Sequence, residues 1–154
     1  MRLERTHDMS VVEEIINHPV VVSSLTDSED WNVMVDVDSI HYMLVMADDD
    51  EVLGIFILIP KNQATVSVHT AFLPRAYGSS TLKAAELLKE YVFNDIEYDK
   101  LITEVPEFNV LACGYAQNSK LVHEGTWKKA YKHEGILYDL YQYGLTKEEY
   151  KCQQ

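Results

Sequence analysis

The chain has 154 residues, 47% of them hydrophobic, and a formal net charge of −12. This length suffices for one well-buried core and is short for two, so we expect a single domain over residues 1–154. The acidic balance disfavours nucleic acids and anionic membranes as partners, because both are bound through clustered lysine and arginine, whereas a basic protein or an amine substrate is compatible with it.

The first helix is expected over Met9 to Asn17, where apolar residues recur at helical spacing before His18 and Pro19 end the pattern. From Val20 to Asp38 the composition is mixed, and Thr26 to Glu29 resembles a capping box. We expect this segment to be a loop with one short helix.

Three strand-like runs follow, and they predict consecutive antiparallel strands. They are Ile40 to Met46, Val52 to Ile59 and Ala64 to Leu73. Asp48-Asp49-Asp50 predicts a turn between the first two, and Lys61-Asn62-Gln63 separates the second from the third.

The apolar period changes from two to about 3.6 over Ser80 to Phe93, which predicts a helix there. The remaining elements are a short buried strand over Leu101 to Val105, a helix over Asn109 to Asn118, and a hairpin of Glu124 to Tyr131 and Ile136 to Leu145 around His133-Glu134-Gly135. The predicted order is a strand, a helix, three strands, a helix, a strand, a helix and two strands, with no residues assigned to the first strand. A strand, a long helix and another strand in the middle imply a parallel crossover that splits an otherwise antiparallel sheet.

The longest strongly apolar run, Val52 to Pro60, is far shorter than the about 20 residues of a membrane span, and the polar N-terminus is unlike a signal peptide. We therefore expect a cytoplasmic protein. Cys113 and Cys152 are the only cysteines and the six histidines are scattered, so the sequence predicts neither a disulfide scaffold nor a metal site.

The segment Arg75-Ala76-Tyr77-Gly78-Ser79-Ser80 joins the third strand to the following helix and is a candidate anion site. Backbone N–H groups at a helix start have no intrahelical acceptor, and the helix dipole adds partial positive charge there. Gly78 allows close approach of the backbone, and Ser79 or Ser80 can cap the helix. Taken alone, these residues also fit an ordinary strand-to-helix turn.

The order of elements and this loop together resemble the GNAT family of acetyl-coenzyme A-dependent N-acetyltransferases, from about Ile40 to Leu145. Arg75-x-x-Gly78-x-Ser80 is similar to the family's Arg/Gln-x-x-Gly-x-Gly/Ala pyrophosphate loop. The spacing of Glu104, Asn109 and Glu124-Gly125, and the closing segment 143–150, resemble the ribosomal-protein alanine N-acetyltransferase branch. The chain also looks like small acetyltransferase-like proteins encoded by bacteriophages.

The resemblance implies an α/β (α+β) fold, with a mixed and mostly antiparallel sheet that splays at a parallel pair and has helices on both faces. It implies that acetyl-coenzyme A lies in the splay, with its pyrophosphate on the amides of residues 77–80. Its pantetheine would pair with the backbone of Ala71, Phe72 and Leu73. Arg75 and Lys83 either add positive charge at the mouth or are ordinary surface charges. Asn109 would contact the pantetheine or cap the helix that it begins, and the two roles are compatible.

Acetyl transfer needs a deprotonated amine, a polarised thioester carbonyl and an acid for the leaving thiolate. By position in the resemblance, Glu104 is the candidate base and His69 the second candidate; each is alternatively a structural residue. The family's usual tyrosine acid falls on Ala116, with Tyr115 one position earlier, a rotation of about 100° on a helix. Four alternatives remain open. Tyr115 reaches the sulfur by a local distortion of the helix, or a water or Cys113 is the acid, or catalysis has been lost, or Tyr115 only packs in the core.

We therefore expect an enzyme that transfers acetyl from acetyl-coenzyme A to a primary amine, such as a protein N-terminus or a lysine, without a metal and as a monomer or homodimer. The alternative is a catalytically weakened protein of the same fold that acts by binding a partner protein.

Overall fold

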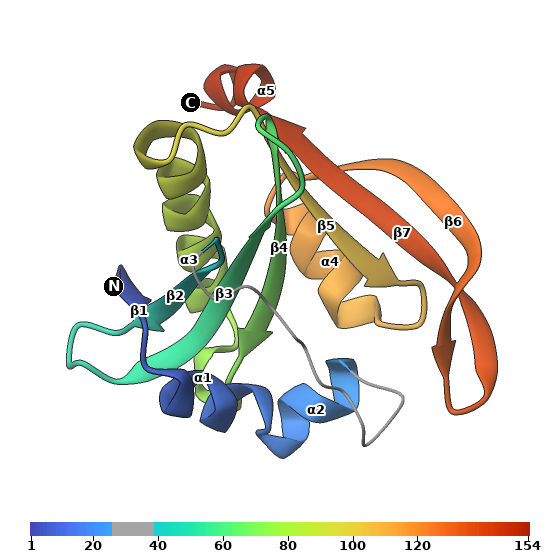
Figure 1. Cartoon of the computed structure of the whole chain (residues 1–154), viewed down its shortest axis with the longest axis horizontal. Helices are drawn as coiled ribbons and strands as arrows, with labels where there is room; N and C mark the ends of the chain where they lie inside the picture. Colours follow the sequence, from blue (N-terminus) through green and yellow to red (C-terminus); the bar gives the residue numbers. More distant parts are fainter. Residues whose placement is uncertain (26–38) are drawn as a thin grey trace.

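The computed structural model describes residues 1–25 and 39–154, and its centre is a seven-stranded sheet in the order β1-β2-β3-β4-β5-β7-β6 (Figure 1). The strands are β1 (Arg2–Thr6), β2 (His41–Met46), β3 (Val52–Pro60), β4 (Thr65–Phe72), β5 (Lys100–Pro106), β6 (Val122–His133) and β7 (Ile136–Thr146). Neighbouring strands are antiparallel except β4 and β5, which are parallel. The predicted mixed sheet with one parallel crossover is confirmed.

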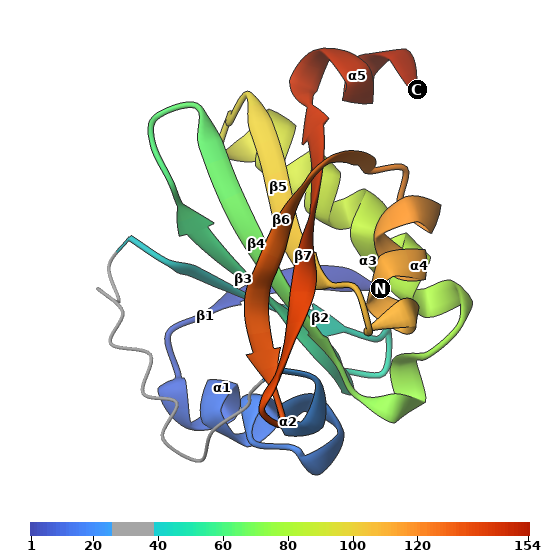
Figure 2. The same ribbon diagram turned by 90° about the vertical axis from the view of Figure 1, so that its right-hand side faces the viewer.

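The helices cover both faces of this sheet. They are α1 (Met9–Ile16), α2 (Pro19–Leu25), α3 (Ser79–Glu90), α4 (Val110–Asn118) and α5 (Lys147–Cys152), with a 3-10 turn at Pro74–Ala76 and a π-helical turn at Tyr91–Asp95. Figure 2 shows α3 and α4 together on one side of the sheet, away from α1 and α2. No helix in the described part of the chain combines the length and hydrophobicity needed to cross a membrane.

Alternate residues of the strands build a core on each face, as the two-residue period of a strand requires. On β2, Met43 and Val45 belong to the core that α3 covers, whereas Tyr42 and Leu44 belong to the core that Val12 and other apolar residues of α1 and α2 cover. This burial on both faces explains the nearly continuous apolar runs of β2 and β3.

Two segments differ from the sequence expectation. A helix, α2, forms over Pro19–Leu25, because a proline is tolerated in the first turn, where its missing N–H costs no hydrogen bond. The capping box expected at Thr26 to Glu29 lies outside the described residues. At the C-terminus α5 begins with a capping box between Thr146 and Glu149, a helix that the apolar pattern did not predict because it has only six residues.

Candidate active site

The sheet opens between its two parallel strands. Pairing of β4 with β5 covers only Thr65 to Ser67 against Lys100 to Ile102, although β4 continues to Phe72 and β5 to Pro106. The Thr103 hydroxyl donates to the Val68 carbonyl at 3.0 Å and closes the apex of the opening. Beyond it lies a cavity of about 110 Å³, lined by both strands, α3 and α4. The split that the sequence predicted near the candidate anion loop is present.

The loop before α3 offers unpaired backbone donors. Gly78 is the N-cap of α3 with a φ of +106°, a conformation that favours glycine, and the space around its Cα is open. The amides of Ser79 and Ser80 donate to no described residue, as expected for the first turn of a helix. Gly78 rather than Ser79 or Ser80 is therefore the cap, and α3 starts with free donors toward solvent.

Part of this loop is already bonded internally. The Ala76 amide donates to the Leu73 carbonyl at 2.9 Å, and the Tyr77 amide donates to the Pro74 carbonyl at 3.2 Å, forming the 3-10 turn. The expectation that the Tyr77 amide would meet a phosphate is therefore not supported by the geometry, which leaves the donors of Gly78, Ser79 and Ser80.

Arg75 does not point its charge at these donors. Its Nε donates to the Val52 carbonyl at 2.8 Å and its guanidinium pairs with Glu51 at 2.9 Å, which ties the loop to the start of β3. Lys83 is exposed. The N-terminal amine lowers the pKa of Asp48 by a hydrogen bond and by its charge, and the charge of Lys83 adds a smaller contribution in the same direction. Arg75 thus has its charge partner on the β2–β3 side.

The free edge of β4 lies at Phe72 and Thr70. The Leu73 amide donates to the Leu53 carbonyl at 2.9 Å, so the peptide groups of Leu73 and, two residues earlier, Ala71 face β3. The intervening peptide groups of Phe72 and Thr70 face the opening toward β5. Of the three residues expected to pair with a pantetheine, only Phe72 is available, and Thr70 is the second free position.

Gly54 makes this arrangement possible. It lies opposite Phe72 on β3, and a Cβ there would come within 2.4 Å of the Ala71 carbonyl oxygen. Only glycine lets β3 approach β4 so closely at the end of β4, in the stretch that is no longer paired with β5.

Asn109 is the N-cap of α4. Its side chain accepts a hydrogen bond from the Ala112 amide at 3.1 Å, which confirms the capping role, and the residue also lines the cavity. The cap fixes the start of α4 directly beside the opening.

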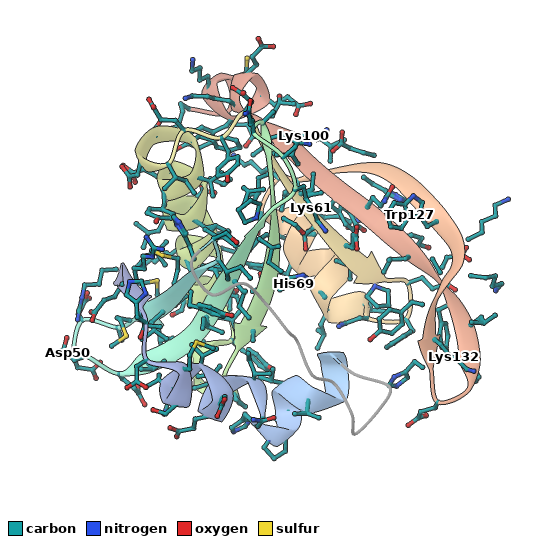
Figure 3. All side chains as sticks on the ribbon, viewed as in Figure 1. Asp50, Lys61, His69, Lys100, Trp127 and Lys132 are labelled. Carbon is teal, nitrogen blue, oxygen red and sulfur yellow. The ribbon has the colours of Figure 1, made fainter. Side chains whose placement is uncertain are left out.

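His69 and Glu104 lie on the face of the sheet opposite α3 and α4. Val68 of β4 and Leu101 of β5 are in the core under α3, and side chains alternate along a strand, so His69 and Glu104 point to the α1 and α2 side (Figure 3 marks His69 on β4). Both residues line the opening. The two candidate bases therefore lie together on the α1 and α2 face of the sheet, beside the gap between β4 and β5 that leads to the α3 and α4 face.

The surroundings of His69 favour its neutral form. Its side chain is exposed by surface area, yet the protein around it removes enough water that desolvation lowers its pKa, while the negative charge of Glu104 partly opposes this. A neutral imidazole can accept a proton, so either residue has the chemistry of a base.

Tyr115 and Ala116 both line the cavity. Alanine has no hydroxyl, and the hydroxyl of Tyr115 is buried. The Tyr115 ring packs edge-on against Phe72 with centroids 5.5 Å apart, and its buried oxygen has no hydrogen-bond partner among the described residues. Burial raises the pKa of Tyr115, and the nearby Ser119 hydroxyl partly opposes the rise. Ala116 is 2% exposed and packs with Val105 and Tyr143.

Sequence reasoning missed Thr70, Thr103 and Lys89 at this site. Lys89 lies in the cavity wall with 2% exposure, and its ammonium donates to Glu86 at 2.7 Å and to the Ser119 carbonyl at 3.2 Å. A lysine in the last turn of an amphipathic helix reads as a surface charge, so no signal in the sequence marked it as buried.

Within residues 1–25 and 39–154 no three histidine, cysteine or acidic side chains gather as a metal site would require. The Cys113 thiol donates to the Pro106 carbonyl at 3.8 Å, and Cys152 is exposed.

No family model and no curated protein matches this sequence. Solved structures do match its fold. The spermidine N-acetyltransferase of Vibrio cholerae in complex with CoA and spermine has a TM-score of 0.81 at 15% identity, covering 97% of this chain and 96% of that one. The same enzyme in complex with manganese ions has a TM-score of 0.78 at 15% identity, covering 99% and 95%. A GNAT-family acetyltransferase from Bacillus anthracis has a TM-score of 0.63 at 18% identity, covering 72% and 68%. The chain has the fold of the GNAT acetyltransferases.

Proposed function

We propose that this protein is an acetyl-coenzyme A-dependent N-acetyltransferase that acts on a primary amine. The observation that carries the proposal is the split between β4 and β5, which has free backbone donors and a cavity on the α3 and α4 face and two candidate bases on the opposite face. Such a gap lets two substrates meet, each from its own side of the sheet. Direct transfer requires that the two reacting groups come together in this way.

The residues present fit an acyl-coenzyme A. The free amides of Ser79 and Ser80 suit its pyrophosphate, and Gly78 leaves room for close approach. The unpaired peptide groups of Phe72 and Thr70 suit the amides of its pantetheine, in the manner of an added strand. When bound, the donor supplies an activated thioester carbonyl at the gap.

Glu104 accepts the proton that the amine loses, directly or through a water, and His69 is the second candidate for this role. Because desolvation lowers its pKa, His69 is neutral at pH 7 and competent to do so. Tyr115 keeps its proton, since burial raises its pKa. It carries the hydroxyl of α4, and after a local adjustment this hydroxyl serves the departing thiolate.

The acceptor we propose is an amine on a cationic molecule. The net charge of −12 attracts such molecules. A protein N-terminus or a lysine is our first choice. An N-terminal alanine peptide of a ribosomal protein is the peptide implied by the resemblance of the Glu104, Asn109 and Glu124-Gly125 spacing to the ribosomal-protein alanine N-acetyltransferase branch. Spermidine is the second acceptor to be tested, for comparison with the peptides, because the Vibrio cholerae enzyme is a spermidine N-acetyltransferase.

The test has two parts. Acetyl-coenzyme A at about 100 times its dissociation constant stabilises the folded state by about 2.7 kcal/mol, so Tm rises by several degrees. Thiol release is then followed with N-terminal peptides, lysine peptides and spermidine. No rise in Tm at millimolar ligand contradicts the proposal. A rise without thiol release for any amine supports the alternative, a coenzyme-binding protein that acts through a partner, which the packing of Tyr115 against Phe72 favours.

A further inference from the structure

We infer that the acceptor is a peptide chain with a free N-terminal α-amine, and that Gln142 of β7 and Trp127 of β6 bind it beside Glu104. The inference rests on the proposed function, because it names the acceptor of the same reaction. It separates a peptide N-terminus from a lysine side chain and from a polyamine.

Glu104, Gln142 and Gly125 form one row across three neighbouring strands. The register pairs Glu104 of β5 with Gln142 of β7, and Gln142 with Gly125 of β6. Paired residues of antiparallel strands point to the same face, with their Cβ atoms about 5 Å apart. Tyr143, the next residue of β7, lies in the core under α4, so Gln142 points to the α1 and α2 side, as Glu104 does. The Gln142 side chain is therefore the neighbour of the candidate base.

A second row on the same face ends in an exposed aromatic side chain. Pro106 of β5 pairs with Leu140 of β7, and Leu140 pairs with Trp127 of β6. Trp127 is 52% exposed, and Figure 3 marks it on β6. From the spacing of strands and of residues along them, its Cα lies roughly 12 Å from that of Glu104. A chain that starts at Glu104 reaches Trp127 with its second or third residue.

This part of the face is open among the described residues. The core that α1 and α2 cover includes residues of β2, β3 and β4 and none of β5, β6 or β7. The Gln142 amide lies over Gly125, where a Cβ would come within 3.2 Å of its Oε1, and it forms no hydrogen bond with a described residue. A polar amide and an exposed tryptophan thus lie beside the candidate bases with their binding capacity unused.

Two adjacent polar side chains suit the two polar groups at the start of a peptide. In an N-terminal residue the carbonyl lies next to the amine, so Glu104 can receive the amine while the Gln142 amide donates to the carbonyl. A lysine side chain separates its amine from the nearest carbonyl by its whole hydrocarbon stem. Spermidine has no carbonyl at all.

The charges around Glu104 suit one ammonium group and not several. Glu124 is already paired with the Lys100 ammonium at 2.6 Å. Desolvation lowers the pKa of His69 most, and the positive charge of Lys61 lowers it further, so Lys61 acts on this same face (Figure 3). A polyamine would bring further positive charges toward Lys61, whereas a peptide N-terminus brings one charge to Glu104.

The reaction is acetyl transfer to the α-amine. The amine nitrogen forms a bond to the thioester carbonyl carbon, and the carbon–sulfur bond breaks. The amine gives up one proton to Glu104, and the thiolate takes one proton to leave as the thiol. An N-terminal amide and free coenzyme A result, with no oxidant or further reactant.

The first experiment measures kcat/KM by thiol release at saturating acetyl-coenzyme A. The acceptors are a lysine-free tetrapeptide amide with a free N-terminus, the same peptide with a blocked N-terminus and one lysine, butylamine and spermidine. The free N-terminus is expected to exceed each of the others by about tenfold, the value of one additional hydrogen bond. An equal or higher value for the lysine peptide, butylamine or spermidine overturns the inference.

The second experiment removes the amide. Gln142→Leu is expected to lower the peptide-to-butylamine ratio of kcat/KM by about tenfold, mainly through the KM of the peptide. Thr126→Val is the control, because Thr126 pairs with Tyr141 on the opposite face, and it should keep the wild-type ratio. An unchanged ratio in folded Gln142→Leu overturns the role of Gln142. If Gln142→Leu does not fold, Gln142→Glu keeps the shape, removes the donor to the carbonyl and decides on the same ratio.

The third experiment tests the contact with Trp127. In the wild type the tetrapeptide amide is expected to exceed alanine amide by about tenfold in kcat/KM, because only the longer chain reaches Trp127. Trp127→Ala is expected to remove this gain. A gain that persists in Trp127→Ala overturns the role of Trp127.

Binding of free coenzyme A, measured by calorimetry, separates the two failures. If it does not bind, or if no acceptor releases thiol, the proposed function fails and the inference with it. If spermidine or the lysine peptide is acetylated best, the proposed function stands and only the inference is wrong.

Discussion

Glu104 and His69 belong to neighbouring strands, lie on the same face of the sheet and interact electrostatically across the gap. They are 35 positions apart in the chain, and nothing in this spacing indicates that the two side chains lie close together. The alternation of β4 and β5 places them there, because Val68 and Leu101 must fill the opposite core.

Glu104→Gln is expected to lower kcat by about 10²- to 10⁴-fold, since removal of a general base costs that much. The measurement is thiol release at saturating donor and amine. Glu107→Gln is the matched control, because Glu107 is on the turn that follows β5, accepts from the Asp139 amide and is not among the described residues that line the cavity. Activity that survives Glu104→Gln would transfer the role of base to His69.

The stability of the protein should fall as the pH drops below about 6.5, in part through His69. Because desolvation lowers its pKa in the folded state, the unfolded chain binds a proton at a pH where the folded chain does not, and protonation favours unfolding. His69→Gln is expected to lose less Tm than the wild type between pH 7.5 and 5.5. Equal losses would show that His69 is not desolvated.

At the scale of elements, the strand–loop–helix unit from β4 to α3 was recognisable in the sequence because its marks are local. A glycine at the helix start and a change of apolar period are short-range signals. The partners of the loop residues could not be predicted from the sequence. Arg75 forms an ion pair with Glu51, and the Tyr77 amide donates to the Pro74 carbonyl.

Gly78→Val is expected to weaken coenzyme A binding by at least about tenfold, measured by calorimetry. A φ of +106° is strained for any branched residue, and the side chain would occupy the space where the phosphates approach. Gly114→Ala is the control. It lies inside α4 with open space around it, so it should keep the affinity and raise stability by about 0.5–1 kcal/mol. Unchanged affinity in folded Gly78→Val would refute the anion site.

At the scale of the whole molecule, the excess of acidic residues should affect the binding of the acceptor, and therefore its KM, and not the rate of the chemical step. Raising the salt from about 0.05 to 0.3 M is expected to raise KM several-fold for a polycationic acceptor and much less for a peptide whose only charge is its N-terminus, because salt screens long-range attraction. Steady-state kinetics at constant pH measure this. Equal salt dependence for both acceptors would show that the acidic residues are ordinary solvated surface.

The sequence by itself determined the order of strands and helices, the parallel crossover and the loop before α3, because apolar period, glycine and proline act within a few residues. It placed one short helix within Val20 to Asp38 but did not predict that α2 begins at Pro19, and it missed α5, which is too short for a period.

Only the tertiary structure decided which groups share the site. The unpaired stretch of β4 and β5, the burial of Lys89, the packing of Tyr115 on Phe72 and the cavity beside Ala116 all depend on contacts between segments distant in the chain. Such contacts arise from how whole faces of the sheet are filled, and a local pattern of residues cannot specify that.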